Sequence, residues 1–143
     1  MSKTRARKIK LLLFDVDGVM TDGKLWIFPA LADPPLATTA MGGAPRSLNM
    51  IEGKSFHAHD GTAISLARLG GVKTGLITKR ISETVALRAR DLRLEYVYQG
   101  VLVKVRVFEE ILETEKITAA EAAYIGDDAV SYTHLTLPTT PYV

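Results

Sequence analysis

The first apolar run of the chain, Ile9–Phe14, ends at the acidic segment Asp15-Val-Asp-Gly18. A short continuous apolar run is typical of a strand that is buried on both faces of a parallel sheet. Carboxylates that directly follow such a strand are costly to bury unless a cation meets them. The sequence therefore predicts an inner parallel strand that delivers Asp15 and Asp17 to a polar site.

Three further apolar segments alternate with helical segments. We expect strands at Val72–Thr78, Glu95–Tyr98 and Ala122–Ile125, and helices over residues 61–69, 83–92 and 105–116. Asp60 and Ser82 are candidate caps of the first two helices, and Thr118 to Glu121 matches a capping box. Strands alternating with helices indicate βαβ units, so we predict an α/β fold: a Rossmann-like parallel sheet with helices on both faces. The helix over residues 61–69 is expected to bury Ala63, Ile64, Ala67 and Leu66.

A small β-hairpin insertion is predicted after the first strand. Its strands would cover residues 24–28 and 51–59, with the Ala-, Pro-, Gly-, Thr- and Ser-rich residues 30–50 as a loop insertion between them. His57 and His59 would share one face of the second strand. Without cysteine or a third ligand at suitable spacing, we do not expect them to bind zinc. We interpret Trp26 and Phe28 as hairpin core or a subunit contact.

Composition excludes several classes of protein. The chain has 143 residues, a formal net charge of +2 and no cysteine. This size suits one domain, and the small charge argues against a nucleic-acid partner. No apolar run reaches the roughly 18 residues of a membrane span, and Ile9–Phe14 is too short for a signal peptide. We expect a basic flank over residues 1–8, one domain over residues 9–129, no membrane partner and a cytoplasmic location.

Polar residues gather at the predicted strand ends, where ligands bind in open parallel sheets. Thr78 ends the second core strand, Lys104 opens the third helix, and Asp127 and Asp128 follow the last strand. Taken alone, each has a plain structural interpretation, such as a turn, a surface hydroxyl or a solvated lysine. Together with the first acidic pair they provide carboxylates for Mg²⁺ and donors for a phosphoryl group. The combination favours a phosphoryl-transfer site.

The segment Leu13-Phe-Asp-Val-Asp-Gly-Val-Met-Thr-Asp22 resembles motif one of the haloacid dehalogenase superfamily. Thr78, Lys104 and Gly126-Asp-Asp128 fall where motifs two, three and four belong. More narrowly, the chain resembles the capless branch typified by 3-deoxy-D-manno-octulosonate 8-phosphate phosphatase. The supporting segments are Asp17–Gly23, Phe56–Gly61, Gly75–Thr78 with Arg80, Tyr98–Gly100 before Lys104, and Tyr124–Asp128. The similarity runs from about Lys8 to Asp128.

The resemblance implies a magnesium-dependent phosphatase of lipopolysaccharide biosynthesis that hydrolyses 3-deoxy-D-manno-octulosonate 8-phosphate through an aspartyl-phosphate, and a homotetramer. Asp15 would be the nucleophile and a metal ligand. Asp17 would be the general acid/base and a metal ligand through its backbone carbonyl. The remaining roles would fall to Thr78 and Lys104 for the phosphoryl group, Arg80 for the substrate carboxylate, Asp127 for the metal, and Asp128 for water-mediated or orienting contacts.

Two alternatives are open, and a third is excluded. In the first alternative, the substrate is a 9-phosphate of a nonulosonic acid, which presents similar chemical groups. In the second, the domain is a non-catalytic oligomerisation or regulatory module, as sometimes accompanies acylneuraminate cytidylyltransferases, although the intact acidic set argues against this. A calcium loop starting at Asp15 fails on spacing, because Trp26 stands where the closing glutamate is needed.

Two features depart from the family pattern. Lys79 stands where a glycine is usual, and its side chain would crowd the phosphate loop or add positive charge. The segment Val130–Thr139 resembles a translated sequencing adapter. We therefore interpret residues 130–143 as an artefactual, non-family tail, and we expect the C-terminal part of the fold to be incomplete.

Overall fold

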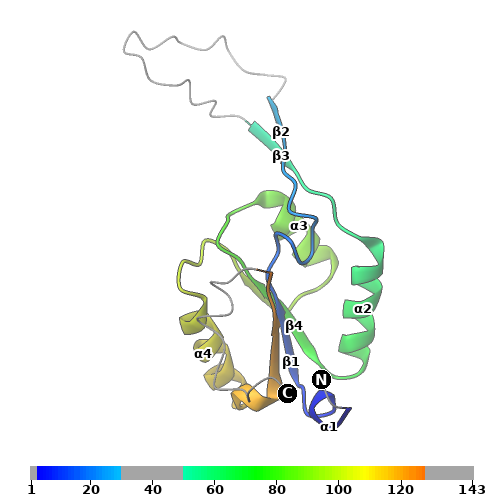
Figure 1. The fold of residues 1–143 in the computed structure, drawn as a ribbon, viewed down its shortest axis with the longest axis vertical. Coiled ribbons are helices and arrows are strands. Elements are labelled where there is room, and N and C mark those ends of the chain that lie inside the picture. Colours follow the sequence, from blue (N-terminus) through cyan, green and yellow to red (C-terminus); the bar gives the residue numbers. More distant parts are fainter. Residues whose placement is uncertain (1–2, 30–49, 128–143) are drawn as a thin grey trace, which may run out of the picture.

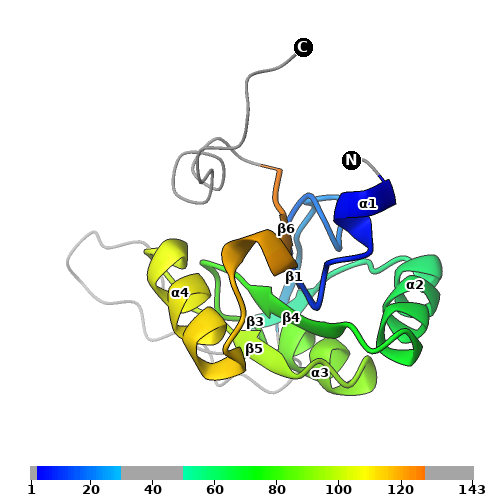
Figure 2. The same cartoon turned by 90° about the horizontal axis from the view of Figure 1, so that it is seen from below.

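A parallel sheet forms the centre of the molecule. The computed structural model describes residues 3–29 and 50–127. Its four core strands are β1 (Leu11–Phe14), β4 (Lys73–Ile77), β5 (Tyr96–Tyr98) and β6 (Ala122–Ile125), in the spatial order β5-β4-β1-β6 (Figures 1 and 2). Leu13 pairs with Gly75 on one side and with Tyr124 on the other, so the first apolar run lies inside the sheet. This confirms the predicted α/β fold with a parallel sheet.

Helices cover both faces of this sheet, as Figure 2 shows. Helices α2 (Ala58–Leu69) and α3 (Glu83–Asp91) pack on one face, and α4 (Lys104–Glu115) packs on the other. The strand β1 serves both layers: Leu11 and Leu13 contact the α4 layer, while Phe14 contacts the α2 and α3 layer. Alternation of side chains along the strand explains why a continuous apolar run is needed at this place.

The start of β1 is tied to the start of β6. A short helix, α1 (Lys3–Ala6), precedes β1, and a 3₁₀ turn over Ala119–Glu121 precedes β6. The predicted capping box is present, because Glu121 accepts a hydrogen bond from the Thr118 N–H at 2.9 Å. Glu121 also pairs with Lys10 at 2.5 Å. Its bonds with Lys10 and Thr118 lower the pKa of Glu121 to about 2.

An antiparallel hairpin stands away from the domain. Its strands are β2 (Trp26–Pro29) and β3 (Met50–Gly53), with Ile27 opposite Glu52 (Figure 1). Four large apolar side chains remain about half exposed on it: Trp26, Ile27, Phe28 and Ile51. The predicted hairpin insertion is therefore present, and it offers an apolar surface that the described part of this chain does not bury.

The structure corrects several local predictions. The strand predicted over residues 51–59 ends at Gly53, and His57 is the N-cap of α2, where its Nδ1 accepts from the His59 N–H at 3.1 Å. The two histidines thus belong to a helix start and not to one strand face, and Asp60 lies inside the first turn instead of capping it. The helix starts earlier because an imidazole nitrogen supplies the cap.

The inner stripe of α2 is narrower than predicted. Ile64 is buried, whereas Ala63 is exposed and Leu66 is 62% exposed. Of the predicted stripe, Ile64 belongs to the core cluster with Phe14 and Leu76.

The proposed tail over residues 130–143 lies outside the described residues, and so does Asp128. Among the helices of residues 3–29 and 50–127, none is both long and apolar enough to cross a bilayer.

Candidate active site

The loop after β1 turns tightly and holds the first two acidic side chains. The carbonyl oxygen of Val16 accepts hydrogen bonds at 2.9–3.2 Å from three later N–H groups, those of Val19, Met20 and Thr21. Gly18 has a φ of +79°, a conformation that side chains disfavour and glycine adopts readily. Val16 and Met20 are buried in the core. The loop is therefore fixed at the carboxyl end of β1, together with Asp15 and Asp17.

Asp15 is buried and meets a cation. It is 7% exposed; one carboxylate oxygen accepts from the Val16 N–H at 2.7 Å, and the other accepts from Lys104 Nζ. Lys104 Nζ lies 3.1 Å from the Tyr124 hydroxyl. Burial disfavours the charged ammonium, but the bonds to Asp15 and Tyr124 outweigh burial and raise the pKa of Lys104. A carboxylate and an ammonium thus lie together in a largely desolvated place.

The strand ends next to β1 add further donors. Thr78 follows β4 directly and is 2% exposed; its N–H donates to Tyr98 at 2.9 Å, and its carbonyl accepts from Val101 at 3.0 Å. These bonds fix the loops after β4 and β5 to one another. Lys104 is the first residue of α4, and Val103 provides no side-chain cap. The partial positive charge at a helix start favours an anion.

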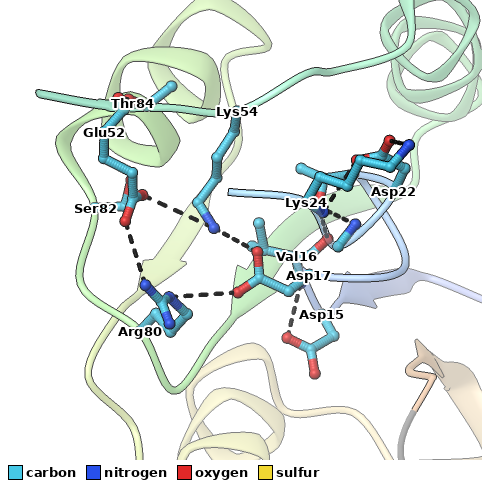
Figure 3. Close-up of polar contacts among 12 residues, drawn as sticks. Asp15, Val16, Asp17, Asp22, Lys24, Glu52, Lys54, Arg80, Ser82 and Thr84 are labelled. Carbon is cyan, nitrogen blue, oxygen red and sulfur yellow. Dashed lines mark hydrogen bonds and ion pairs between the residues drawn. The ribbon is translucent and has the colours of Figure 1, made fainter. Parts of the chain in front are cut away.

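A second group of charges surrounds Asp17 (Figure 3). Lys54, which directly follows β3, contacts one carboxylate oxygen of Asp17, and its side chain is 0% exposed. Arg80 Nε lies 3.8 Å from the other oxygen, and its terminal nitrogen lies 3.4 Å from Glu52. Burial acts to raise the pKa of Glu52, but the Ser82 side chain, Lys54 and Arg80 together outweigh burial and lower this pKa. Two carboxylates and two cations therefore form a network of ion pairs here.

One cavity collects these side chains. Its volume is about 710 Å³, and residues from all of the strand ends line it, including Asp15, Asp17, Thr78, Arg80, Lys104 and Asp127. Asp127 lies against the loop after β1: a Cβ built on Gly18 would be 1.8 Å from its Oδ2. Lys79 lines the same cavity and is exposed.

The donors in this cavity suit a hard cation in part. Asp15 and Asp127 supply carboxylate oxygens next to the backbone of the loop after β1, which is the oxygen chemistry that Mg²⁺ prefers. Within residues 3–29 and 50–127, no three His, Asp or Glu side chains are grouped so as to hold a metal. The Asp17 side chain is engaged by Lys54 and Arg80. A metal here would need a backbone oxygen beside the carboxylates of Asp15 and Asp127.

The predicted site residues are largely brought together. Six of them line the cavity, while Asp128 lies outside the described residues. Sequence reasoning missed Glu52, Lys54 and Tyr124. A cue for the first two exists, because residues two apart in an extended segment share a face, so Glu52 and Lys54 are expected on one side of the hairpin.

No family model matches the chain. It is 32% identical over 129 residues to the 3-deoxy-D-manno-octulosonate 8-phosphate phosphatase of Salmonella typhi, an alignment that covers 90% of this chain and 58% of that enzyme. A protein of Legionella pneumophila, described as a HAD-superfamily (subfamily III A) hydrolase, superposes with a TM-score of 0.72 at 30% identity, covering 91% of this chain and 61% of that one. The chain has the HAD-superfamily fold.

A further solved structure carries ligands. The 3-deoxy-D-manno-octulosonate 8-phosphate phosphatase of Moraxella catarrhalis, in complex with magnesium, phosphate and a KDO molecule, superposes with a TM-score of 0.71 at 27% identity. The superposition covers 91% of this chain and 64% of that one. The resemblance expected from the motifs is confirmed. The chain nevertheless spans only about three fifths of the length of these relatives.

Proposed function

We propose that this chain is a metal-dependent phosphomonoesterase that acts on a sugar-acid phosphate. The observation that carries this proposal is the buried Asp15 carboxylate, paired with Lys104 in a cavity that Asp17 and Thr78 also line. A buried carboxylate next to donors for a charged group is the arrangement of a covalent phosphoryl-transfer site. The similarity to named phosphatases supports the same class of reaction.

In the first step, an Asp15 oxygen attacks the phosphorus and the bond to the ester oxygen breaks. Asp17, in its protonated form, gives its proton to the leaving ester oxygen. Lys104, Thr78 and the N–H groups at the start of α4 take up the charge on the transferring oxygens. The products of this step are an alcohol and a phosphorylated Asp15.

In the second step, water attacks the phosphorus of phosphorylated Asp15, and the bond between phosphorus and the Asp15 oxygen breaks. Asp17, now a carboxylate, takes the proton from this water. Inorganic phosphate leaves and Asp15 is regenerated. The same side chain thus serves as acid and then as base, which requires that its carboxylate face the reacting oxygen in both steps.

Mg²⁺ is the cofactor that we propose for this site. Asp15, Asp127 and the backbone carbonyl of Asp17 would hold it, with Asp128 in a supporting role. When bound, it would supply positive charge against the phosphate oxygens. The Moraxella catarrhalis relative contains magnesium together with phosphate, which supports this choice of cation.

For the substrate we propose 3-deoxy-D-manno-octulosonate 8-phosphate, with a nonulosonate 9-phosphate as the alternative to be tested beside it. Arg80 is 48% exposed at the cavity wall, and its planar guanidinium suits a substrate carboxylate. Its present partners, Glu52 and Asp17, are carboxylates too. An arginine that already binds carboxylates can exchange one for that of a sugar acid.

We also propose that the chain acts as a homotetramer. The half-exposed apolar side chains of the hairpin, Trp26, Ile27, Phe28 and Ile51, support a subunit contact there. Light scattering after size exclusion measures the mass. Substitution of Trp26 and Phe28 by serine should lower that mass, and a tetramer that persists would contradict a role of the hairpin.

The test of the enzyme is phosphate release by the purified chain. 3-Deoxy-D-manno-octulosonate 8-phosphate and a nonulosonate 9-phosphate are compared, each with Mg²⁺ and with EDTA. We expect release that requires Mg²⁺ and that Asp15→Asn abolishes while circular dichroism is unchanged. A folded, monodisperse chain without release from either substrate would overturn the proposal and favour a non-catalytic module.

A further inference from the structure

The lysine that follows the hairpin is engaged with the proposed acid/base residue. Lys54 Nζ contacts Asp17 Oδ1, although the two residues are 37 positions apart in the chain. The Lys54 side chain is 0% exposed, and Asp17 is 30% exposed. A buried ammonium is costly unless it is paired, and Lys54 also lies 3.8 Å from Glu52 Oε1. This lysine is therefore built into the site, in contrast to an ordinary surface lysine.

The two cations at Asp17, Lys54 and Arg80, differ in how exposed they are and in how closely they approach the carboxylate (Figure 3). Lys54 meets Oδ1 and is enclosed, whereas Arg80 lies 3.8 Å from Oδ2 and is 48% exposed. An enclosed ammonium holds the carboxylate oxygen that it contacts in one place, because moving it away from that oxygen would weaken the pairing of a buried charge. An exposed guanidinium at a longer distance can turn to another anion. The orientation of Asp17 thus depends on Lys54.

The place of Lys54 is set by the body of the domain. The carbonyl oxygen of Glu52 accepts a hydrogen bond from Thr84 Oγ1, in α3, at 2.7 Å. The Glu52 side chain is paired with Arg80 at 3.4 Å. The inner end of β3 is therefore attached to α3 and to the loop after β4, so Lys54 reaches Asp17 from a fixed backbone.

We propose that Lys54 is a positioning residue: it holds the Asp17 carboxylate so that its second oxygen faces the ester oxygen of the substrate. This inference rests on the proposed phosphatase activity. It assigns to the segment after the hairpin a direct part in the proton-transfer geometry. A merely structural lysine would change stability, but it would not change the rate according to how much the leaving group needs a proton.

Leaving groups separate these two roles. An alkyl phosphate needs a proton on its leaving oxygen, whereas p-nitrophenolate leaves without one. Single-turnover release of the leaving group is measured with enzyme in excess, so that only the first step counts. For Lys54→Met we expect the alkyl phosphate rate constant to fall about 10- to 100-fold. Release of p-nitrophenol should stay within about threefold of the wild-type rate.

A double-variant cycle tests whether Lys54 acts through Asp17. In the Asp17→Asn background, Lys54→Met should change the alkyl phosphate rate no further, because the group that it positions is gone. Lys24→Met is the matched control. Lys24 also pairs with an aspartate of the same loop, Asp22, at 3.0 Å, but it is 73% exposed. We expect wild-type rates for it.

Three outcomes would overturn the positioning role: equal losses of rate with both substrates, additive losses in the Asp17→Asn background, or an unchanged rate for Lys54→Met. In each of them, turnover by the wild type would still uphold the phosphatase activity. Absence of turnover in the folded wild type would overturn both. If Lys54→Met does not fold, Lys54→Gln carries the same comparison, since its amide removes the charge and keeps a donor.

Discussion

The glycine after the first acidic pair provides a quantitative test of the site. Gly18 has a φ of +79°, and a Cβ added there would lie 1.8 Å from Asp127 Oδ2 and 2.6 Å from its Cγ. Asp127 Cβ would be 3.3 Å away, so the carboxylate itself must swing aside. Gly18→Ala should therefore move Asp127 out of the proposed metal site and weaken Mg²⁺ binding by at least about tenfold.

Gly71→Ala separates backbone strain from this collision. Gly71 has the same φ of +79°, and a Cβ there meets nothing within 4 Å. Each alanine costs about 1–2 kcal/mol in the free energy of unfolding, because both residues adopt the left-handed region. Only Gly18→Ala combines this cost with displacement of a carboxylate.

Isothermal titration with Mg²⁺ and urea denaturation measure the two effects. We expect Gly71→Ala to keep wild-type Mg²⁺ affinity and to lose stability alone. Equal Mg²⁺ affinities of the Gly18→Ala variant and the wild type, in folded protein, would refute the placement of Asp127 as a metal ligand. Equal loss of affinity in both variants would show that strain, and not the carboxylate, is responsible.

Three further predictions concern charge and packing. Lys104→Met should lower the free energy of unfolding by about 2 kcal/mol in urea titrations. This is less than the about 3–5 kcal/mol lost when one partner of a fully buried ion pair is removed, because the cavity admits water. Adding Asp15→Asn to this variant should restore most of the lost stability. Burial and Glu115 raise the pKa of Tyr96 to about 12 from 10.0. Its contribution to stability is thus complete below pH 10 and disappears as the pH rises towards 12; absorbance and denaturation titrations check this, and Tyr96→Phe should remove that pH dependence. Ile111→Ala, at a side chain that is 0% exposed, should cost about 2–4 kcal/mol, and a loss below 1 kcal/mol in urea denaturation would contradict its place in the core.

Much of the fold follows from local patterns. The strand Ala122–Ile125 was predicted with the bounds that the structure has. The helix after Ser82 begins at Glu83 as expected, with Ser82 at the N-cap position, but the Ser82 side chain makes no cap hydrogen bond. These elements are predictable because burial on both faces selects continuous apolar runs, and helix starts select particular residues. The start of α2 was predicted incorrectly, because a histidine cap is unusual and Asp60 three residues later is the commoner capping residue type.

The site shows the same division. Asp15, Asp17, Thr78 and Lys104 could be named from the sequence, because parallel strands bring their carboxyl ends to one edge and chemistry restricts the residues there. The pairing of Asp17 with Lys54 could not be derived, since it joins positions 37 apart through a hairpin whose path is set by packing against α3.

The sequence by itself determined the order of the main strands and helices along the chain, the α/β class and the acidic residues after β1. These depend on short-range rules: side-chain alternation, capping and the cost of burying a charge. Only the tertiary structure decided which cation meets which carboxylate, with Lys104 on Asp15 and Lys54 on Asp17. Ion pairing acts over a few ångströms in space and is indifferent to distance along the chain, so it emerges only when the chain is folded.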